Sequence, residues 1–359
     1  MNWAVPVLIG AGAFALWVVY FLLAGAARRR AAKRAIKITT PNGVQETLFV
    51  PLGGVEQCIS IRGEDCTNPV LLILHGGMAM SYMPLSPLLR AWEKDFTLVQ
   101  WDRRGVAATF QRSGRKGMGE MSLQRIIADG IELAEYLHAR LPGRRLVLLG
   151  HSMGSMIGAS MAAARPDLFA AYVGSEQIVS MVRNEAVSYE MVRARLAADG
   201  KTRALAKLDR LGPPPYRALR KWGVKQGLVE TADEVYGAVF TEKLRPALGA
   251  YFDLRGLTSF IGGNIFCGGK LYDQWMAFDA AALGPRFGLP MIVIQGEDDV
   301  MTPTRLAEEW LASLVAPRKE LATIAGVGHL AMFVRPAVFL QVLLEKTQSA
   351  ISPAPTRAA

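Results

Sequence analysis

The chain contains few of the residues that build metal centres and disulfide frameworks. Among its 359 residues there are three cysteines and four histidines. Cys58, Cys66 and Cys267 form no metal-type or redox-type pair, and a small odd number of cysteines argues against a disulfide framework. We therefore expect three free thiols, with a Cys58–Cys66 bridge across a hairpin as the alternative. No pattern in the sequence indicates a metal ion or an organic cofactor.

Acidic residues are absent from the first 45 positions, where basic residues gather instead. The segment 28–37 holds six of these basic residues: Arg28, Arg29, Arg30, Lys33, Arg34 and Lys37. The whole chain has a net charge of +10, but without these six residues 35 basic residues face 31 acidic ones. Because the rest of the sequence has no cluster of basic residues, we do not expect it to bind nucleic acid.

A run of 25 residues without a charge, Trp3–Ala27, precedes the basic segment. With a rise of ~1.5 Å per residue, a helix of this length spans the ~30 Å hydrocarbon core of a bilayer. A secretory signal would carry its positive charge before the apolar run. A retained transmembrane anchor is therefore favoured over a cleaved signal or a buried core helix. We predict an anchor and basic juxtamembrane segment at 1–37, in a single-pass membrane protein whose remaining chain is cytoplasmic.

Short apolar runs alternate with helical stretches in the rest of the chain. Four such runs occupy 71–74, 96–101, 146–149 and 291–294. Runs of this kind are typical of strands buried on both faces, and their alternation with helices predicts a mostly parallel, doubly wound α/β sheet. Between the second and third runs, apolar residues recur at helical spacing after Ser122, which predicts a capped helix.

The alternation changes over residues 177–280, which hold amphipathic helical pieces, a proline-rich turn and a glycine-rich run. We interpret this segment as a helical insertion between strands of the sheet. The predicted core then consists of 38–176 and 281–350. The last residues, 351–359, are rich in proline and alanine and are predicted to be disordered.

The sequence around Ser152 predicts a nucleophile. The pattern Gly150-His151-Ser152-Met153-Gly154 follows a predicted strand and precedes a predicted helix. In this context Gly-x-Ser-x-Gly forms a tight strand-to-helix turn that exposes the serine hydroxyl, and small flanking residues let the turn form. A serine hydroxyl needs a neighbouring base to act as a nucleophile at neutral pH.

The base is found by elimination among four histidines. His75 precedes a glycine pair, His138 lies within the capped helix, and His151 is held in the turn beside Ser152. His329 remains, on a late loop that agrees with the chain order serine, acid, histidine. It is our predicted general base.

Three carboxylates follow the fourth apolar run, at Glu297, Asp298 and Asp299. The spacing to Thr302-Pro303 favours Asp299 as the acid that orients the histidine, with Asp298 as the alternative. For the oxyanion we expect two backbone N–H donors, one from Met153 and one from Gly77.

These motifs resemble α/β-hydrolases similar to prolyl aminopeptidases. The shared motifs, in order, are His75-Gly76-Gly77, Trp101-Asp102-Arg103-Arg104-Gly105, Gly150–Gly154, Asp299-x-x-Thr302-Pro303 and Gly328-His329. The resemblance covers about residues 45–345 and implies a helical cap over the active site, formed by 177–280. Within the segment that enters the cap, Glu176 is the acidic residue we nominate to bind a substrate amine, and a solvated residue at the cap entrance is the alternative.

The sequence therefore predicts a membrane-anchored serine hydrolase that cleaves a small ester or amide, or a short peptide, through an acyl-enzyme. Met78 and Met153 stand where prolyl aminopeptidases usually have proline and tryptophan, and the cap contains few acids to hold an amine. Esters or lipid-like substrates therefore rank first, and a prolyl-type aminopeptidase is the alternative. A catalytically silent binding protein on the same scaffold is the non-enzymatic alternative, because a fold does not imply an activity.

Overall fold

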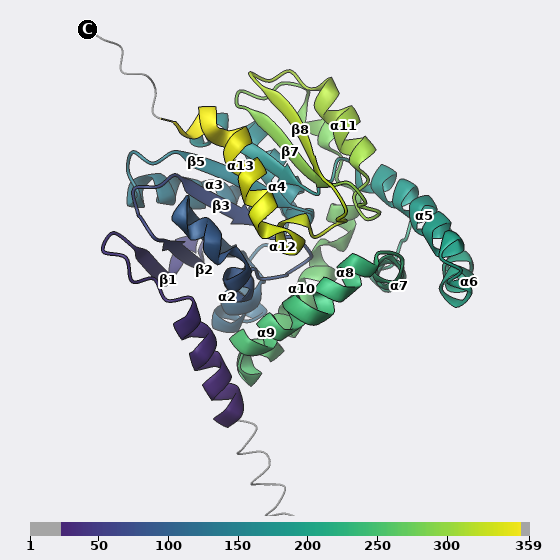
Figure 1. The fold of residues 1–359 in the computed structure, drawn as a ribbon, viewed down its shortest axis with the longest axis horizontal. Helices are drawn as coiled ribbons and strands as arrows, with labels where there is room; N and C mark the ends of the chain where they lie inside the picture. Colours follow the sequence, from purple (N-terminus) through teal and green to yellow (C-terminus); the bar gives the residue numbers. More distant parts are fainter. Residues whose placement is uncertain (1–22, 353–359) are drawn as a thin grey trace, which may run out of the picture.

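A computed structural model describes residues 23–352 of the chain (Figure 1). Within them, eight strands form one sheet in the order β1-β2-β4-β3-β5-β6-β7-β8. The strands are β1 (Val44–Leu52), β2 (Val55–Gly63), β3 (Val70–Leu74), β4 (Thr97–Asp102), β5 (Leu146–His151), β6 (Ala171–Ser175), β7 (Met291–Gly296) and β8 (Lys319–Ile324).

The sheet is mostly parallel, as predicted. Strands β3 to β8 pair in parallel, whereas β1 and β2 form an antiparallel edge that joins the sheet at β4. The four predicted apolar runs lie within β3, β4, β5 and β7, apart from Phe96, which directly precedes β4. Their residues are buried on both faces, which is why they read as continuous apolar runs.

Helices cover both faces of the sheet and bury two separate cores. On one face, Leu72 of β3 packs in the cluster that includes residues of α3 and α4. On the other face, Leu71 packs in the cluster that includes residues of η1 and α13. The predicted cap of α3 is present, since the Ser122 hydroxyl accepts a hydrogen bond from the Arg125 N–H at 3.0 Å. The helices of the core are η1 (Met83–Lys94), α2 (Ala107–Ser113), η2 (Lys116–Met118), α3 (Leu123–Arg140), α4 (Met153–Ala164), η3 (Pro166–Leu168), η5 (Ala280–Leu283), α11 (Thr304–Ser313), α12 (Ala331–Val334) and α13 (Pro336–Ile351).

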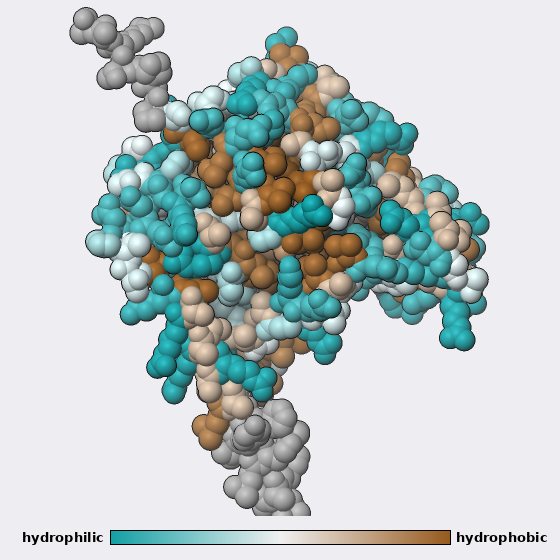
Figure 2. Space-filling model, viewed as in Figure 1, coloured by the Kyte–Doolittle hydropathy of each residue, from teal (hydrophilic) through white to brown (hydrophobic). Residues whose placement is uncertain are grey.

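A helical insertion lies between β6 and β7, at one end of the sheet (Figure 1). Its elements are α5 (Met181–Ala198), α6 (Thr202–Leu211), α7 (Leu219–Ala232), α8 (Glu234–Val239), η4 (Phe240–Leu244), α9 (Arg245–Tyr251) and α10 (Leu254–Met276). Helices α5, α6 and α7 share a small hydrophobic cluster, which also includes Val300 of the hydrolase core. Figure 2 shows apolar surface near the centre of the drawn face, where α8 of the insertion contacts α12. The domain boundaries at 177 and 280 remain a prediction.

The two ends of the chain lie largely outside the described residues. Residues 23–35 form a helix that leads toward β1. No helix within residues 23–352 combines the length and the apolar character needed to cross a membrane. Most of the predicted span Trp3–Ala27 lies outside this range, as does most of the predicted tail. That tail was predicted to begin one residue too early, because α13 continues through Ile351. The three cysteines are free thiols, so the alternative Cys58–Cys66 bridge is wrong.

Candidate active site

Ser152 stands on a strained turn between β5 and α4. Its φ of +51° is rare for a residue with a side chain, and its N–H donates to the Ser175 carbonyl at 2.9 Å. A Cβ atom at Gly154 would lie 2.1 Å from the Leu74 carbonyl oxygen, and one at Gly150 would lie 2.7 Å from the Gly154 carbonyl oxygen. Positions 150 and 154 must therefore both be glycine for the turn to pack against the sheet.

The structure brings Ser152, His329 and Asp299 together from three loops. His329 Nε2 lies 2.9 Å from Ser152 Oγ, and His329 Nδ1 lies 3.0 Å from Asp299 Oδ2. All three residues are buried. The alternative acid, Asp298, is exposed and meets this region through its backbone, whose N–H donates to the Val327 carbonyl at 3.0 Å. The geometry thus favours Asp299 over Asp298.

Thr302 holds the Asp299 carboxylate in place. Asp299 Oδ1 accepts hydrogen bonds from the N–H groups of Met301 and Thr302, at 2.7 and 2.9 Å, and Oδ2 accepts from the Thr302 hydroxyl. Burial alone would raise the pKa of the Asp299 carboxyl, but the charge of His329 and these hydrogen bonds outweigh burial and lower it. Asp299 is therefore held as a carboxylate beside the imidazole.

Burial and nearby charges have opposite effects on the pKa of His329. Burial lowers the pKa of its imidazole, whereas the carboxylates of Asp299, Glu176 and Asp233 raise it. The carboxylates prevail, so the pKa of His329 lies above its ordinary value of 6.5. The ring is thereby more basic than a free histidine, which suits a group that takes a proton from a hydroxyl.

Both predicted oxyanion donors lie at the cavity beside Ser152. Gly77 and Met153 line it, and no described protein group accepts a hydrogen bond from either N–H. The loop that carries Gly77 is fixed by Arg103, a buried residue that the sequence marked only as part of a motif. Its guanidinium donates to the carbonyl oxygens of His75, Gly77 and Met78 at 3.0, 3.0 and 3.1 Å.

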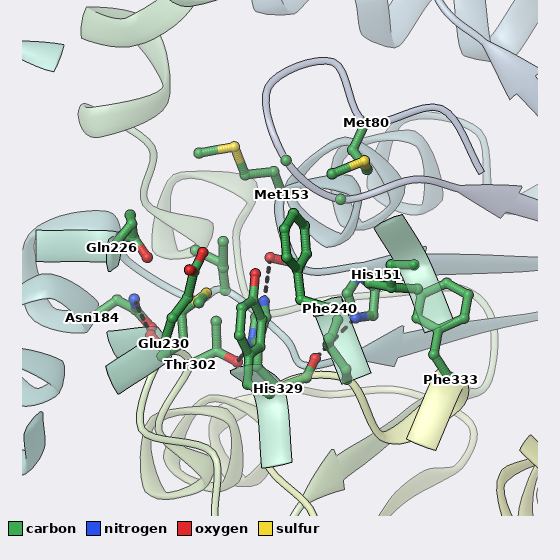
Figure 3. A pocket seen from close by; sticks show the side chains of 18 of the residues that line it. Met80, His151, Met153, Asn184, Gln226, Glu230, Phe240, Thr302, His329 and Phe333 are labelled. Atoms are coloured by element: carbon green, nitrogen blue, oxygen red, sulfur yellow. Dashed lines mark hydrogen bonds between the residues drawn. The ribbon is translucent and has the colours of Figure 1, made fainter. Parts of the chain in front are cut away.

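A cavity of about 200 Å³ opens at Ser152 between the core and the helical insertion. Most of its lining is apolar. Its polar side chains come from the core, with His151, Ser152, Thr302 and His329, and from α5 and α7 of the insertion, with Asn184, Glu185, Gln226 and Glu230. Figure 3 shows Asn184, Gln226 and Glu230 toward one side of His329, with Phe333 on the other. A mainly apolar pocket with a few polar groups is typical of small-molecule sites.

Comparison with known proteins identifies the family. Residues 69–336 match the sequence pattern of the alpha/beta hydrolase fold family. This chain belongs to the α/β-hydrolase fold family. It is 28% identical over 305 residues to a protein named probable aminopeptidase YbaC from Bacillus subtilis (strain 168), covering 81% of this chain and 93% of that protein.

Solved structures of similar fold agree with this assignment. A membrane phospholipase A, described as a bacterial virulence factor, matches with a TM-score of 0.64 and 18% identity, over 98% of this chain and all of the other. A proline iminopeptidase from Mycobacterium smegmatis matches with a TM-score of 0.57 and 19% identity, over 86% and 98% of the two chains. The predicted resemblance to the prolyl-aminopeptidase-like branch is confirmed, and the chain is a hydrolase of esterase-like or aminopeptidase-like kind.

In this α/β-hydrolase, a hydrogen-bonded chain beneath the nucleophile joins the loops of the site. The Gly76 N–H donates to the Tyr82 hydroxyl oxygen at 3.0 Å, and that hydroxyl lies 2.6 Å from His151 Nδ1. Because the Tyr82 hydroxyl has its own proton to give, Nδ1 accepts and the ring proton of His151 lies on Nε2. This Nε2 lies 3.1 Å from the His329 carbonyl oxygen and 3.2 Å from Glu176 Oε2.

The structure does not place Glu176 in the lining of the cavity, which argues against the prediction that it binds a substrate amine. The residue is fully buried, which also excludes the alternative of a solvated cap-entrance residue. At the end of β6 its backbone adopts φ +46°, and the side chain turns under the nucleophile, where Oε2 accepts from the Ser175 hydroxyl. Glu176 Oε1 has no hydrogen-bond partner among the described residues.

The acids that do line the cavity come from the insertion, at Glu185 and Glu230. Glu185 is buried and compensated, with Trp222 Nε1 at 3.1 Å and the buried Lys225 Nζ at 3.2 Å. Glu230 has no charged partner among the described residues. Its side chain is open to the cavity, yet the surrounding protein desolvates it enough to raise the pKa of its carboxyl above 4.5. The prediction that the cap has few acids to hold an amine did not single out Glu185 and Glu230, because the sequence does not say which helix faces point toward Ser152.

Proposed function

We propose that this α/β-hydrolase is a membrane-anchored serine hydrolase that cleaves an ester or amide bond through an acyl-enzyme, with lipid-like esters as its preferred substrates. The observation that carries the proposal is the contact chain Ser152–His329–Asp299, with distances of 2.9 and 3.0 Å, at a mainly apolar cavity. Nucleophile, base and orienting acid in contact are the requirement for activating a serine hydroxyl.

The proposed reaction follows from the geometry of the site. Ser152 Oγ attacks the substrate carbonyl carbon while His329 Nε2 takes its proton, and the Asp299 carboxylate stabilises the resulting imidazolium. The N–H groups of Met153 and Gly77 stabilise the oxyanion. The imidazolium then protonates the leaving alcohol or amine, and a water activated by His329 releases the acyl group from Ser152.

The substrate class rests on the cavity and on the N-terminal segment. Apolar side chains from the core and the insertion, including Met153, Phe240 and Phe333, would pack against an acyl chain. The uncharged run Trp3–Ala27, followed by six basic residues, supports a transmembrane anchor with the hydrolase domain on the cytoplasmic side. Such an anchor would hold the site near lipid. One protein of similar fold is described as a membrane phospholipase A.

Labelling with a fluorophosphonate probe tests the proposal directly. The full-length protein should be labelled at Ser152, and Ser152→Ala should abolish labelling while the protein remains folded. Absence of labelling in the intact protein would contradict the proposal and favour a binding protein on a hydrolase scaffold. A panel of p-nitrophenyl esters of increasing chain length then measures the preferred acyl group, and a preference for charged acyl groups would contradict the lipid-like assignment.

An aminopeptidase activity is the second candidate, and Glu230 is the observation that favours it. This carboxylate lines the cavity without a charged partner, so it is available to bind the ammonium group of a peptide N-terminus. The relative from Bacillus subtilis is named a probable aminopeptidase. The test is the ratio of kcat/KM between a medium-chain p-nitrophenyl ester and a proline arylamide. A large preference for the arylamide that is lost in Glu230→Gln would favour this second function.

A further inference from the structure

Helix α10 exposes a row of aliphatic side chains on one face. Leu254, Leu257, Ile261 and Ile265 are 73, 41, 50 and 61% exposed. Their spacing of three, four and four residues aligns them along one side of the helix. We call these four residues the α10 stripe. Aliphatic side chains gathered in this way mark a surface that contacts a partner, since single exposed apolar residues are scattered on ordinary surfaces.

The opposite face of α10 is packed against the hydrolase core. Phe266 and Cys267 are buried there, and Cys267 Sγ donates to the Gly105 carbonyl oxygen at 3.5 Å. The Asn264 side chain donates to the Ala79 carbonyl oxygen at 3.1 Å. These contacts fix the rotation of α10 about its axis, so the stripe cannot turn inward without breaking them.

The start of α10 lies next to the basic N-terminal helix. Arg29, Arg30 and Lys33 of that helix line a hollow together with Phe252, Asp253 and Gly256. Figure 1 shows the helix over residues 23–35, in purple, at the same end of the molecule as α9. The α10 stripe therefore begins where the chain leads toward the uncharged run Trp3–Ala27.

The charges around the stripe are those of a surface suited to anionic lipid. From Leu254 to Gly269, Arg255 is the one charged residue of α10. The neighbouring helix over residues 23–35 contains no acid. Its exposed basic residues are Arg28, Arg30, Lys33 and Arg34. Asp253, at the N-cap of α10, is the one acid that lines the hollow between the two helices. An apolar row next to a predominantly basic helix is the composition of segments that lie in a membrane interface.

We propose that the α10 stripe lies against the surface of a bilayer that contains anionic lipid. The inference rests on the proposed anchoring of the chain through Trp3–Ala27, which brings the bilayer to this end of the molecule. It adds a second contact, made by the cap, that fixes the orientation of the hydrolase domain. The stripe lies on the same helical insertion whose helices α5, α7 and α8 line one part of the cavity at Ser152, so this contact would keep the cavity close to lipid.

Site-specific fluorescence quenching tests the stripe in the full chain. Leu257→Cys is made in a Cys66→Ser background, labelled with an environment-sensitive thiol fluorophore, and reconstituted in vesicles of phosphatidylcholine and phosphatidylglycerol with a headgroup spin-labelled lipid. The matched control is Val338→Cys on α13, because Val338 is also 41% exposed. Cys58 and Cys267 are buried and remain. A headgroup quencher is chosen because interfacial helices sit only about 5–10 Å deep.

The expected result is strong quenching and a blue shift at position 257 but not at position 338, both reduced when phosphatidylglycerol is omitted. Vesicle flotation reports the anchor separately. Flotation without quenching at position 257 overturns the stripe and leaves the anchor intact, whereas failure to float overturns the anchor and with it this inference. A blue shift that persists in detergent, with no quenching by lipid, also overturns it. Chemical cross-linking then tells whether a second copy or the chain's own N-terminal segment covers the stripe.

Discussion

Glu176 Oε2 lies 3.2 Å from His151 Nε2, beneath the nucleophile and away from the substrate cavity. A glutamate at this point has two costs. Its backbone holds a φ of +46°, and one oxygen of its buried carboxylate has no hydrogen-bond partner among the described residues. A residue with only a structural role would not require both a strained backbone and a buried oxygen without a partner. We therefore expect the charge of Glu176 to act on the site.

Replacing Glu176 with glutamine should move the pH profile. His329 is faced by the carboxylates of Asp299, Asp233 and Glu176 and by the rings of His151 and Tyr236. Glu176 raises the pKa of His329, so Glu176→Gln should lower it. Because the neutral imidazole is the active form, the acidic limb of the kcat/KM profile should then shift to lower pH.

Two measurements separate this effect from a general loss of structure. The thermal midpoint of Glu176→Gln should equal or exceed that of the unaltered protein, since an incompletely paired buried charge is removed without a change in volume. Glu230→Gln is the control, because Glu230 lies in the cavity but is not among the groups that shift His329. An unshifted acidic limb in Glu176→Gln would show that its carboxylate does not act on His329.

Asp299→Asn should reduce kcat by roughly 10³–10⁴-fold, because the amide would favour the wrong tautomer of His329. Asp298→Asn is a matched control one residue away, with an exposed side chain. It should leave kcat nearly unchanged. The two variants are compared by steady-state kinetics on the same chromogenic ester, and unfolding curves show whether each remains folded. A damaging Asp298→Asn beside a mild Asp299→Asn would reverse the assignment of the acid.

The catalytic residues could be predicted because their signals are local. Ser152 sits in a five-residue pattern, and His329 and Asp299 follow from chain order and short spacing. The contact of Glu176 with His151 has no such signal, since it depends on β5 and β6 ending side by side. Helix α3 was predicted from its periodicity and its Ser122 cap. Helix η1 was not, because prolines at its start and interior interrupt the helical pattern.

The side chains that line the cavity required the tertiary structure. Glu185 on α5 and Lys225 on α7 are 40 positions apart, yet their charges meet at 3.2 Å and are both buried. The sequence alone does not show that Glu185 forms an ion pair with Lys225. Because of this pair, Glu230 is the acid of the cavity that remains available to bind a substrate amine. The sequence of the insertion predicts helices but does not say which helix faces cover Ser152.

Arg103 is predicted to hold the oxyanion loop rather than to bind substrate. Arg103→Lys keeps the positive charge but cannot donate to three carbonyl oxygens in the same fork geometry. Each buried acceptor left unpaired costs about 1–3 kcal/mol, so the free energy of unfolding should fall by at least that amount. Because the displaced loop carries Gly77, kcat should fall more than KM rises. Urea unfolding and steady-state kinetics measure both effects, and a variant with unchanged kcat would contradict this role.

The N-terminal run should behave as a transmembrane anchor. Full-length protein should stay with membranes in alkaline carbonate, because a span such as Trp3–Ala27 is held by apolar burial that neither pH nor salt disrupts. A chain lacking residues 1–27 keeps the six basic residues of 28–37 and should bind anionic membranes only at low salt, since its attraction to the headgroups is screened. Release of the full-length protein by carbonate would contradict the anchor. A mature N-terminus at residue 28 or beyond would instead identify a cleaved signal, and digestion of the hydrolase domain by protease added outside spheroplasts would overturn its cytoplasmic placement.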